Sequence, residues 1–413
     1  MKQLDSKRLK AYRYRIYPTE EQKEFFAKTF GCVRLIWNLM LNEKLNAYEK
    51  KEKIPRNTPA KYKSEYPFLK EVDSLALMNA QRSLEIAFKN YSKNPKHFRL
   101  PKFKKKKDKQ SYTTNNVNNN IKIDFESELL YLPKIKTGIK IKLHRKFAGR
   151  VVSVTISKTP SDNYYVSVLI ELDNQDEKKN KTKEPKNEVC GIDLGLKDFA
   201  VIKNDTGIYK IEHPKYLRKA EKRLKRLQKA LSRKQKGSKN FEKARKRLAI
   251  QYEYVSNARN DFLHKLSKAI IDDNQVIVVE DLNVKGMFRN VHISKSISDS
   301  GFGTFVRYLE YKAKWYGRTL IIADRFYPSS KLCNVCGYKH KELKLSDRYW
   351  QCPICGTYHD RDVNASINLY TVGMEQPELT SVEHALVDDR ISKEIPKKPS
   401  CNEAGSHTFY KVR

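Results

Sequence analysis

Three acidic side chains occupy positions where divalent metals could bind. Asp193 follows an apolar run typical of a buried strand, and Glu280 ends a second such run. Within residues 359–370, Asp362 stands at the start of a predicted amphipathic helix. An ionised carboxylate inside an apolar strand is costly unless it is paired or binds a metal. Gly195 lets a bulky, charged ligand approach the backbone beside Asp193. Acids on two strands and one helix can hold two cations about 4 Å apart, the arrangement that phosphodiester cleavage uses.

Three neighbouring side chains fit such a site less well. Asp360 precedes Asp362 by two residues, so on a helix the two carboxylates point in different directions. Asp281 lies beyond the strand end and is placed to cap the following turn. His264 is predicted to be an ordinary helix residue, although a position near the metals stays open. We therefore predict that neither Asp281 nor Asp360 is a primary ligand.

Four cysteines form two close pairs, Cys333 with Cys336 and Cys352 with Cys355. Fifteen residues separate the pairs, and a glycine follows each pair. Such pairs bind tetrahedral zinc, and the glycines free the turns around the sulfurs. Because a closed four-thiolate site leaves no open coordination position, we predict a structural zinc ion. A redox disulfide is the alternative.

The chain carries a large excess of positive charge. Its 413 residues include 84 Lys and Arg against 48 Asp and Glu, a net charge of +36. That excess goes far beyond what solubility requires and indicates a nucleic-acid partner. A membrane surface is the rival partner, but the sequence has no apolar stretch of 18 residues and no apolar signal core at its N-terminus. We therefore expect a cytoplasmic protein associated with the nucleoid, built from about two to four domains.

Two basic segments are candidates for contact with nucleic acid. Residues 96–118 interleave Phe98 and Phe103 with lysines, which permits base stacking as well as phosphate neutralisation. Residues 214–270 predict an antiparallel helix pair with an apolar seam and basic outer faces. A merely solvated face is the alternative for the first segment, and a coiled-coil dimer for the second. The candidate contacts are Asn79, Lys104, Lys105, Tyr112, Thr114, Asn115, Arg226 and Arg233.

The N-terminal half predicts a mixture of strands and helices. Residues 11–18 alternate apolar and basic side chains, which is typical of an edge strand. Thr19 and Gln22 predict a capping box at the start of a helix that ends near residue 50. A second helical pattern covers residues 75–91. Short alternating segments between residues 121 and 172 then predict an antiparallel sheet or a small barrel.

Five motifs occur in an order that resembles the TnpB family, the transposon-encoded, RNA-guided nucleases related to type V CRISPR effectors. They are Gly191-Ile-Asp-Leu-Gly, Val278-Val-Glu-Asp-Leu-Asn, Tyr327-Pro-Ser-Ser-Lys-Leu-Cys-Asn-Val-Cys-Gly, Cys352-Pro-Ile-Cys-Gly and His359-Asp-Arg-Asp-Val-Asn-Ala. The resemblance covers roughly residues 10 to 380. It implies that Asp193, Glu280 and Asp362 are RuvC-type catalytic acids and that the four paired cysteines form a zinc ribbon. Ser366 stands where the family usually has Ala, a mild change on a helix.

The resemblance also implies a multidomain α/β plus β fold: an RNase H-like (RuvC) nuclease core with an inserted zinc ribbon, an N-terminal β-barrel wedge domain and a helical recognition lobe. The expected segments are 1–17 and 96–173 for the wedge barrel, 18–95 for the recognition lobe, 174–187 for a linker, 188–327 and 358–372 for the nuclease domain with its basic helix pair 214–270, 328–357 for the zinc ribbon, and 373–413 for a mobile C-terminal tail.

The function implied by the resemblance is RNA-guided DNA cleavage. The expected partners are a guide RNA from the transposon end and double-stranded target DNA beside a short transposon-adjacent motif, with two catalytic Mg²⁺ ions, one structural Zn²⁺ ion and no need for a protein oligomer. A guided DNA-binding repressor with a vestigial nuclease core is the alternative, although no catalytic acid is missing. A transposase that transfers strands itself would need a different arrangement of acids, or a nucleophilic tyrosine with metal-binding histidines, and neither pattern stands out.

Overall fold

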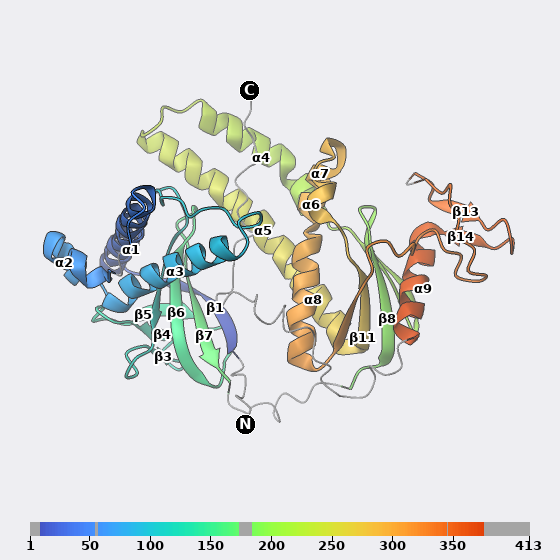
Figure 1. Ribbon diagram of the computed structural model, residues 1–413, viewed down its shortest axis with the longest axis horizontal. Helices are drawn as coiled ribbons and strands as arrows, with labels where there is room; N and C mark the ends of the chain where they lie inside the picture. Colours follow the sequence, from blue (N-terminus) through green and yellow to red (C-terminus); the bar gives the residue numbers. More distant parts are fainter. Residues whose placement is uncertain (1–8, 54–56, 173–183, 345, 376–413) are drawn as a thin grey trace. The chain divides into compact units, whose positions relative to one another are not determined.

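The computed structural model describes residues 9–53, 57–172, 184–344 and 346–375, and Figure 1 shows it as a ribbon. Contacts within the chain separate two compact units, residues 1–180 and residues 181–413. None of the helices in the described ranges combines the length and the apolar character that crossing a membrane requires. The tail predicted over 373–413 and the linker predicted over 174–187 fall mostly outside the described residues.

The first unit contains a seven-stranded antiparallel sheet in the order β2-β6-β7-β1-β5-β4-β3. Its strands are β1 (Leu9–Tyr17), β2 (Gln110–Asn115), β3 (Lys122–Asp124), β4 (Leu129–Tyr131), β5 (Ile139–Lys142), β6 (Arg150–Lys158) and β7 (Tyr164–Glu171). Strand β1 pairs with β7 on one side and β5 on the other, so the prediction of an edge strand is wrong. Its alternation instead buries Tyr14 and Ile16 on one face of a central strand.

The first unit also contains three helices. They are α1 (Glu20–Glu49), α2 (Tyr62–Glu65) and α3 (Ser74–Lys93), with 3₁₀ turns η1 (Pro59–Lys61) and η2 (Pro67–Lys70) between the first and the last. Helices α1 and α3 pack against strand β2. The predicted capping box is confirmed. The backbone N–H of Gln22 donates to the Thr19 hydroxyl, and the backbone N–H of Thr19 donates to the Gln22 side-chain oxygen. Phe26 and Phe30 of α1 pack against Tyr112 of β2.

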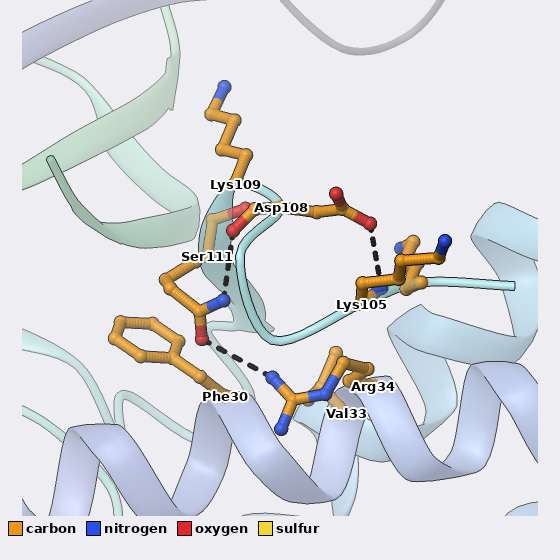
Figure 2. A pocket seen from close by; sticks show the side chains of 9 residues that line it. Phe30, Val33, Arg34, Lys105, Asp108, Lys109 and Ser111 are labelled. Atoms are coloured by element: carbon orange, nitrogen blue, oxygen red, sulfur yellow. Dashed lines mark hydrogen bonds between the residues drawn. The ribbon is translucent and has the colours of Figure 1, made fainter. Parts of the chain in front are cut away.

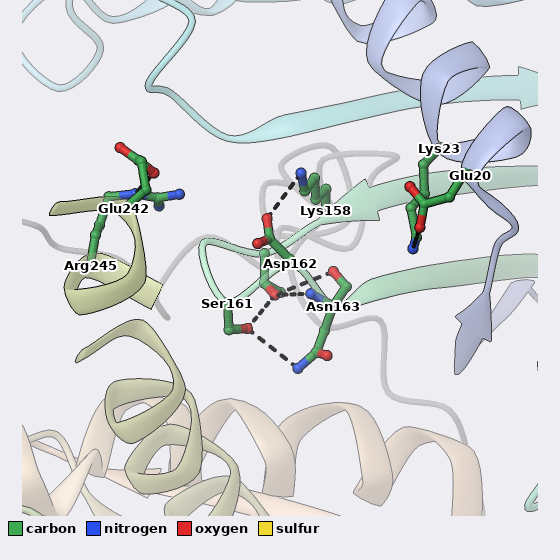
Figure 3. A network of polar contacts seen from close by, with 9 residues as sticks. Glu20, Lys23, Lys158, Ser161, Asp162, Asn163, Glu242 and Arg245 are labelled. Atoms are coloured by element: carbon green, nitrogen blue, oxygen red, sulfur yellow. Dashed lines mark hydrogen bonds and ion pairs between the residues drawn. The ribbon is translucent and has the colours of Figure 1, made fainter. Parts of the chain in front are cut away.

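A polar turn joins strands β6 and β7, and Figure 3 shows its contacts. Asp162 has a positive φ of 65° and forms an ion pair of 3.0 Å with Lys158. The Thr159 hydroxyl lies 2.7 Å from the Ser161 hydroxyl and accepts from the Asn163 N–H. These short-range bonds reverse the chain within five residues and set the register of the hairpin.

The second unit is built on a five-stranded sheet in the order β10-β9-β8-β11-β12. Its strands are β8 (Asn187–Leu194), β9 (Asp198–Asn204), β10 (Gly207–Glu212), β11 (Asn274–Glu280) and β12 (Thr319–Ala323). Strands β8, β11 and β12 run parallel, while β8, β9 and β10 form an antiparallel meander. A parallel pair needs a crossover, and the helices between β10 and β11 and between β11 and β12 provide it.

The second unit contains the helices α4 (Tyr216–Ser232), α5 (Lys239–Asp273), α6 (Val284–Met287), α7 (Val291–Ser300), α8 (Phe302–Tyr316) and α9 (Arg361–Met374). Helices α5 and α8 lie on one face of the sheet and α9 on the other (Figure 1). Cys190 and Ile192 of β8 belong to the core formed with α5, α7 and α8. Val189 of β8 and Val278 of β11 instead pack with Leu369 of α9. Alternate residues of each strand therefore face α9.

The predicted antiparallel helix pair is confirmed as α4 and α5, which lie side by side in Figure 1. Their apolar seam contains Ala220, Leu224 and Val255. Arg226 is exposed on α4 and Arg233 is exposed at its C-cap, in agreement with the basic pattern predicted for the outer face. Beyond this core, a two-stranded hairpin of β13 (Tyr349–Gln351) and β14 (Tyr358–Asp360) precedes α9.

Candidate active site

Strand pairing places Asp193 and Glu280 on the same face of the sheet. In the parallel pair of β8 and β11, Val278 lies opposite Gly191 and Val279 opposite Ile192. The next residues along the two strands are Asp193 and Glu280. Because side chains alternate along a strand, both acids follow Val189 and Val278 to the face that α9 covers. Asp362 lies in the first turn of that helix. Three acids from distant parts of the sequence thus meet at one end of one sheet face.

The electrostatics show that these carboxylates are close enough to interact. Burial, followed by the negative charges of Glu280 and Asp362, raises the pKa of Asp193 well above its usual range. Burial also raises the pKa of Glu280. The positive charge of Arg361 acts in the opposite direction on both groups. Clustered carboxylates are the oxygen donors that a hard divalent cation prefers.

Two partners of these acids were not identified from the sequence. The Arg348 Nη1 atom donates to both oxygens of Asp362, at 3.2 and 2.9 Å. The buried Ser329 hydroxyl donates to a carboxylate oxygen of Glu280. Both residues belong to the segment 328–357 that contains the cysteines. Their positions follow from the tertiary fold, so no local pattern could have indicated them.

The three residues weighed as rival ligands have other partners. The Asp360 carboxylate accepts the backbone N–H groups of Asp362 and Val363, which makes it the N-cap of α9, and it pairs with Lys210 at 2.7 Å. Asp360 therefore precedes helix α9, so the predicted reason for excluding it as a metal ligand, that it points away from Asp362 on the same helix, is wrong. Asp281 pairs with Arg325 at 2.5 Å instead of capping the next turn. His264 stacks on Tyr308 with ring centroids 3.9 Å apart.

The four paired cysteines form a compact cluster that could hold a metal ion. Their sulfur atoms all lie within 4.8 Å of one another. Cys333 Sγ is 3.6 Å from Cys355 Sγ, and Cys336 Sγ is 3.5 Å from Cys352 Sγ. Tetrahedral zinc with Zn–S bonds of about 2.3 Å would separate its sulfurs by about 3.8 Å, so the arrangement fits. Among the described residues no other group of three ligand atoms is as compact, which means that the three acids are spread more widely.

The basic segment before β2 is fixed to helix α1. The Lys104 ammonium lies 3.7 Å from the Trp37 ring centroid, and its backbone N–H donates to Asn38. The exposed Lys105 lines a small pocket of about 40 Å³, where its N–H donates to the Asp108 carboxylate (Figure 2). Lys104 therefore has a packing role, while Lys105 points its charge to solvent.

Two of the predicted nucleic-acid contacts need correction. Tyr112 is only 4% exposed, and its ring packs on α1. Thr114 is 1% exposed, and its hydroxyl donates to the Asp73 carboxylate. Neither side chain is available to read a base edge. Asn79 and Asn115 are only partly buried, and the Asn79 amide donates to the Asn115 side chain at 3.3 Å.

Three family models match parts of the chain. They are described as "Probable transposase" over residues 167–291, "Cas12f1-like, TNB domain" over residues 302–369 and "Helix-turn-helix domain" over residues 6–53. The described part of the last region contains strand β1 and the long helix α1.

Relatives and solved structures extend the similarity over most of the chain. A protein of Streptomyces pristinaespiralis named "Putative RNA-guided DNA endonuclease" is 35% identical over 376 residues, covering 88% of this chain and 89% of that protein. The Escherichia coli K12 protein named "Putative RNA-guided DNA endonuclease InsQ" is 29% identical, with 89% and 93% covered. A chain in the cryo-EM structure of the Cas12f1–sgRNA–target DNA complex has a similar fold, with a TM-score of 0.56 at 16% identity and coverage of 85% and 83%.

The five sequence motifs and the matching family models indicate the same family as these relatives. Several further relatives are named TnpB-like. Since 35% identity extends over nearly the whole of the Streptomyces protein, this chain belongs to the TnpB family.

Proposed function

We propose that this protein is an RNA-guided DNA endonuclease whose nuclease centre is formed by Asp193, Glu280 and Asp362. The observation that carries the proposal is the convergence of these three acids from β8, β11 and α9 on one face of the second sheet. The names of the relatives and the fold shared with Cas12f1 support it. We further propose that the second unit contains an RNase H-like RuvC core and that the metal bound by the three acids is Mg²⁺.

Each acid has a distinct place in the proposed centre. The negative charges of both Glu280 and Asp362 act on Asp193. Ser329 orients Glu280 through its hydroxyl, and Arg348 orients Asp362 through both carboxylate oxygens. Bound Mg²⁺ would supply activation of the attacking water and neutralisation of the leaving oxygen. The adjacent arginines Arg348 and Arg361 provide positive charge beside a phosphate group.

We propose that the cysteine cluster binds zinc and is a folding element of the segment 328–357. Because zinc binding is coupled to folding, Cys333→Ser or Cys352→Ser is expected to lower the melting temperature and the yield of soluble protein. The measurements are zinc content by atomic absorption and thermal unfolding. Cys190→Ser is the control for zinc content: this buried thiol belongs to the apolar core, so the variant should bind zinc normally even though a hydroxyl in the core lowers its stability. A zinc-free preparation with the melting curve of the native protein would contradict this assignment.

We propose that the basic segment before β2 contacts the phosphates of a guide RNA or of target DNA. Replacing Lys105, Lys106 and Lys107 by Ala should weaken binding across sequences and reduce the slope of log K against log[salt] by about one unit per lost contact. Lys104 is left in place because it packs on Trp37. The matched control replaces Lys50, Lys51 and Lys53, another exposed lysine group. An unchanged slope would show that the segment is only a solvated face.

We also propose that Asn79 and Asn115 contribute to the choice of target site. Both side chains remain partly exposed. The Asn79 NH2 group already donates to the Leu75 and Thr113 carbonyls and to Asn115, so base reading falls to the Asn79 side-chain oxygen and the Asn115 NH2 group. Their mutual hydrogen bond makes the pair, and not either residue alone, the unit to replace.

The decisive experiment is to sequence the RNA that copurifies with the protein and to rebuild it with a new guide. Plasmids that match the new guide beside randomised flanking bases are expected to be cut in Mg²⁺, with the surviving plasmids revealing the adjacent motif. Guide-dependent binding without cutting would instead support the guided repressor. Cutting that ignores the guide would reject both.

A further inference from the structure

Two buried asparagines of α9 bind the backbone on both sides of a predicted zinc ligand. Asn364 is 1% exposed and Asn368 is 3% exposed. Both side-chain NH2 groups donate to the Leu332 backbone carbonyl at 2.7 Å. The side-chain oxygen of Asn364 accepts the backbone N–H of Asn334 at 3.1 Å. Cys333 lies between these two backbone groups. The first cysteine turn is thereby held against the helix that begins next to Asp362.

The same amides also reach the partner of Glu280. The Ser329 carbonyl accepts from the Asn368 amide at 2.7 Å and from the Asn364 amide at 3.4 Å. The Ser329 hydroxyl in turn donates to Glu280. One continuous set of hydrogen bonds therefore joins Cys333, helix α9 and Glu280. All of its side-chain donors are buried, where a hydrogen bond is strong and an unsatisfied group is costly.

We propose that Asn364 and Asn368 are positioning residues that couple the order of the cysteine turn to the placement of Glu280 and Asp362. The inference rests on the proposed nuclease function. It adds that the cysteine-containing segment 328–357 influences the positions of Glu280 and Asp362 through hydrogen bonds. Zinc at the cysteines would fix the turn. The two amides would then hold Ser329 and α9 in place, so that Glu280 and Asp362 are arranged to bind a divalent cation. Interactions of this kind behind metal ligands typically change metal affinity by about 10- to 100-fold.

The test measures binding of Mn²⁺, used as a probe, to the full chain with its copurified RNA and without target DNA. Asn368→Asp preserves size but replaces the donating amide by an acceptor that faces two carbonyls. It is expected to weaken Mn²⁺ binding at the acids about 10-fold or more, while zinc content and RNA binding stay unchanged. Ser366→Ala is the matched control, because this buried hydroxyl bonds only within α9. It should leave Mn²⁺ affinity unchanged.

Zinc removal from the native protein is the second arm, and it does not depend on how the variant folds. After chelation and dialysis, the backbone N–H of Asn334 should show faster hydrogen–deuterium exchange. The Mn²⁺ affinity of the zinc-free protein should fall to that of Asn368→Asp. Removing zinc from Asn368→Asp should add little, because interacting sites are not additive. Unchanged Mn²⁺ affinity in either arm, or an equal loss in Ser366→Ala, would overturn the coupling. Because Mn²⁺ binding is read without DNA, these results stay separate from whether the protein cuts a guided target.

Discussion

Asp193→Ala is expected to abolish DNA cleavage while the guide RNA and the target DNA remain bound. Asp193 interacts with the charges of both Glu280 and Asp362, so its removal would take a central carboxylate ligand from the proposed metal centre. Groups that act as a unit lose most of the rate when one of them is removed, here at least about 10³-fold. Binding should persist because the exposed lysines and arginines of both units are untouched. Single-turnover cleavage and a filter-binding assay, on the same preparation, separate the two effects.

Glu280→Ala and Asp362→Ala should have losses of similar size, and combining them with Asp193→Ala should add little. Asp360→Asn is the matched control. Asn is as good an N-cap as Asp, so the start of α9 is preserved while the charge that pairs with Lys210 is lost. This variant should still cut. If Asp360→Asn is inactive and Asp362→Ala is active, the third ligand is Asp360. Full activity of Asp193→Ala in Mg²⁺ would reject the proposed centre.

The parts of this site that were predictable have local signatures. A carboxylate at the end of an apolar run stands out from sequence alone, and so do paired cysteines followed by glycine. The helix pair α4 and α5 and the capping box of α1 were also predictable, since each depends on spacing within about ten residues. That the three acids share one sheet face required the additional expectation that β8 and β11 are parallel neighbours.

The incorrect predictions concern positions whose environment is decided by distant segments. Strand β1 has the alternation of an edge strand, yet β5 and β7 pair with both of its sides. Tyr112 and Thr114 have side chains that suit base recognition, but α1 and Asp73 bury them. Arg348 and Ser329 were missed for the converse reason, because an ordinary surface residue type acquires its role only from what it contacts.

Gly195 and Gly191 show the same limit of sequence-based prediction next to the proposed nuclease centre. That Gly195 admits a ligand stays a prediction, and a Cβ there would meet the Asp198 carbonyl oxygen at 2.9 Å, within the β8–β9 hairpin. A still closer approach, which the sequence did not indicate, occurs at Gly191. A Cβ on Gly191 would lie 2.2 Å from the Tyr370 backbone nitrogen and 2.4 Å from the Ser366 carbonyl oxygen. Only glycine lets α9 pack this closely on β8, and no pattern within β8 indicates that helix.

Gly191→Ala is therefore expected to destabilise the second unit by about 3 kcal/mol or more, because backbone atoms cannot move aside as a flexible side chain can. To make room, α9 must shift from β8, which separates Asp362 from Asp193 and removes cleavage as well. Gly303→Ala in α8 is the matched control: its Cβ would meet nothing within 4 Å, so it should be neutral or stabilising by up to about 1 kcal/mol. Thermal unfolding and cleavage of both variants test this packing. Native stability in Gly191→Ala would show that α9 does not lie against β8 as closely as described.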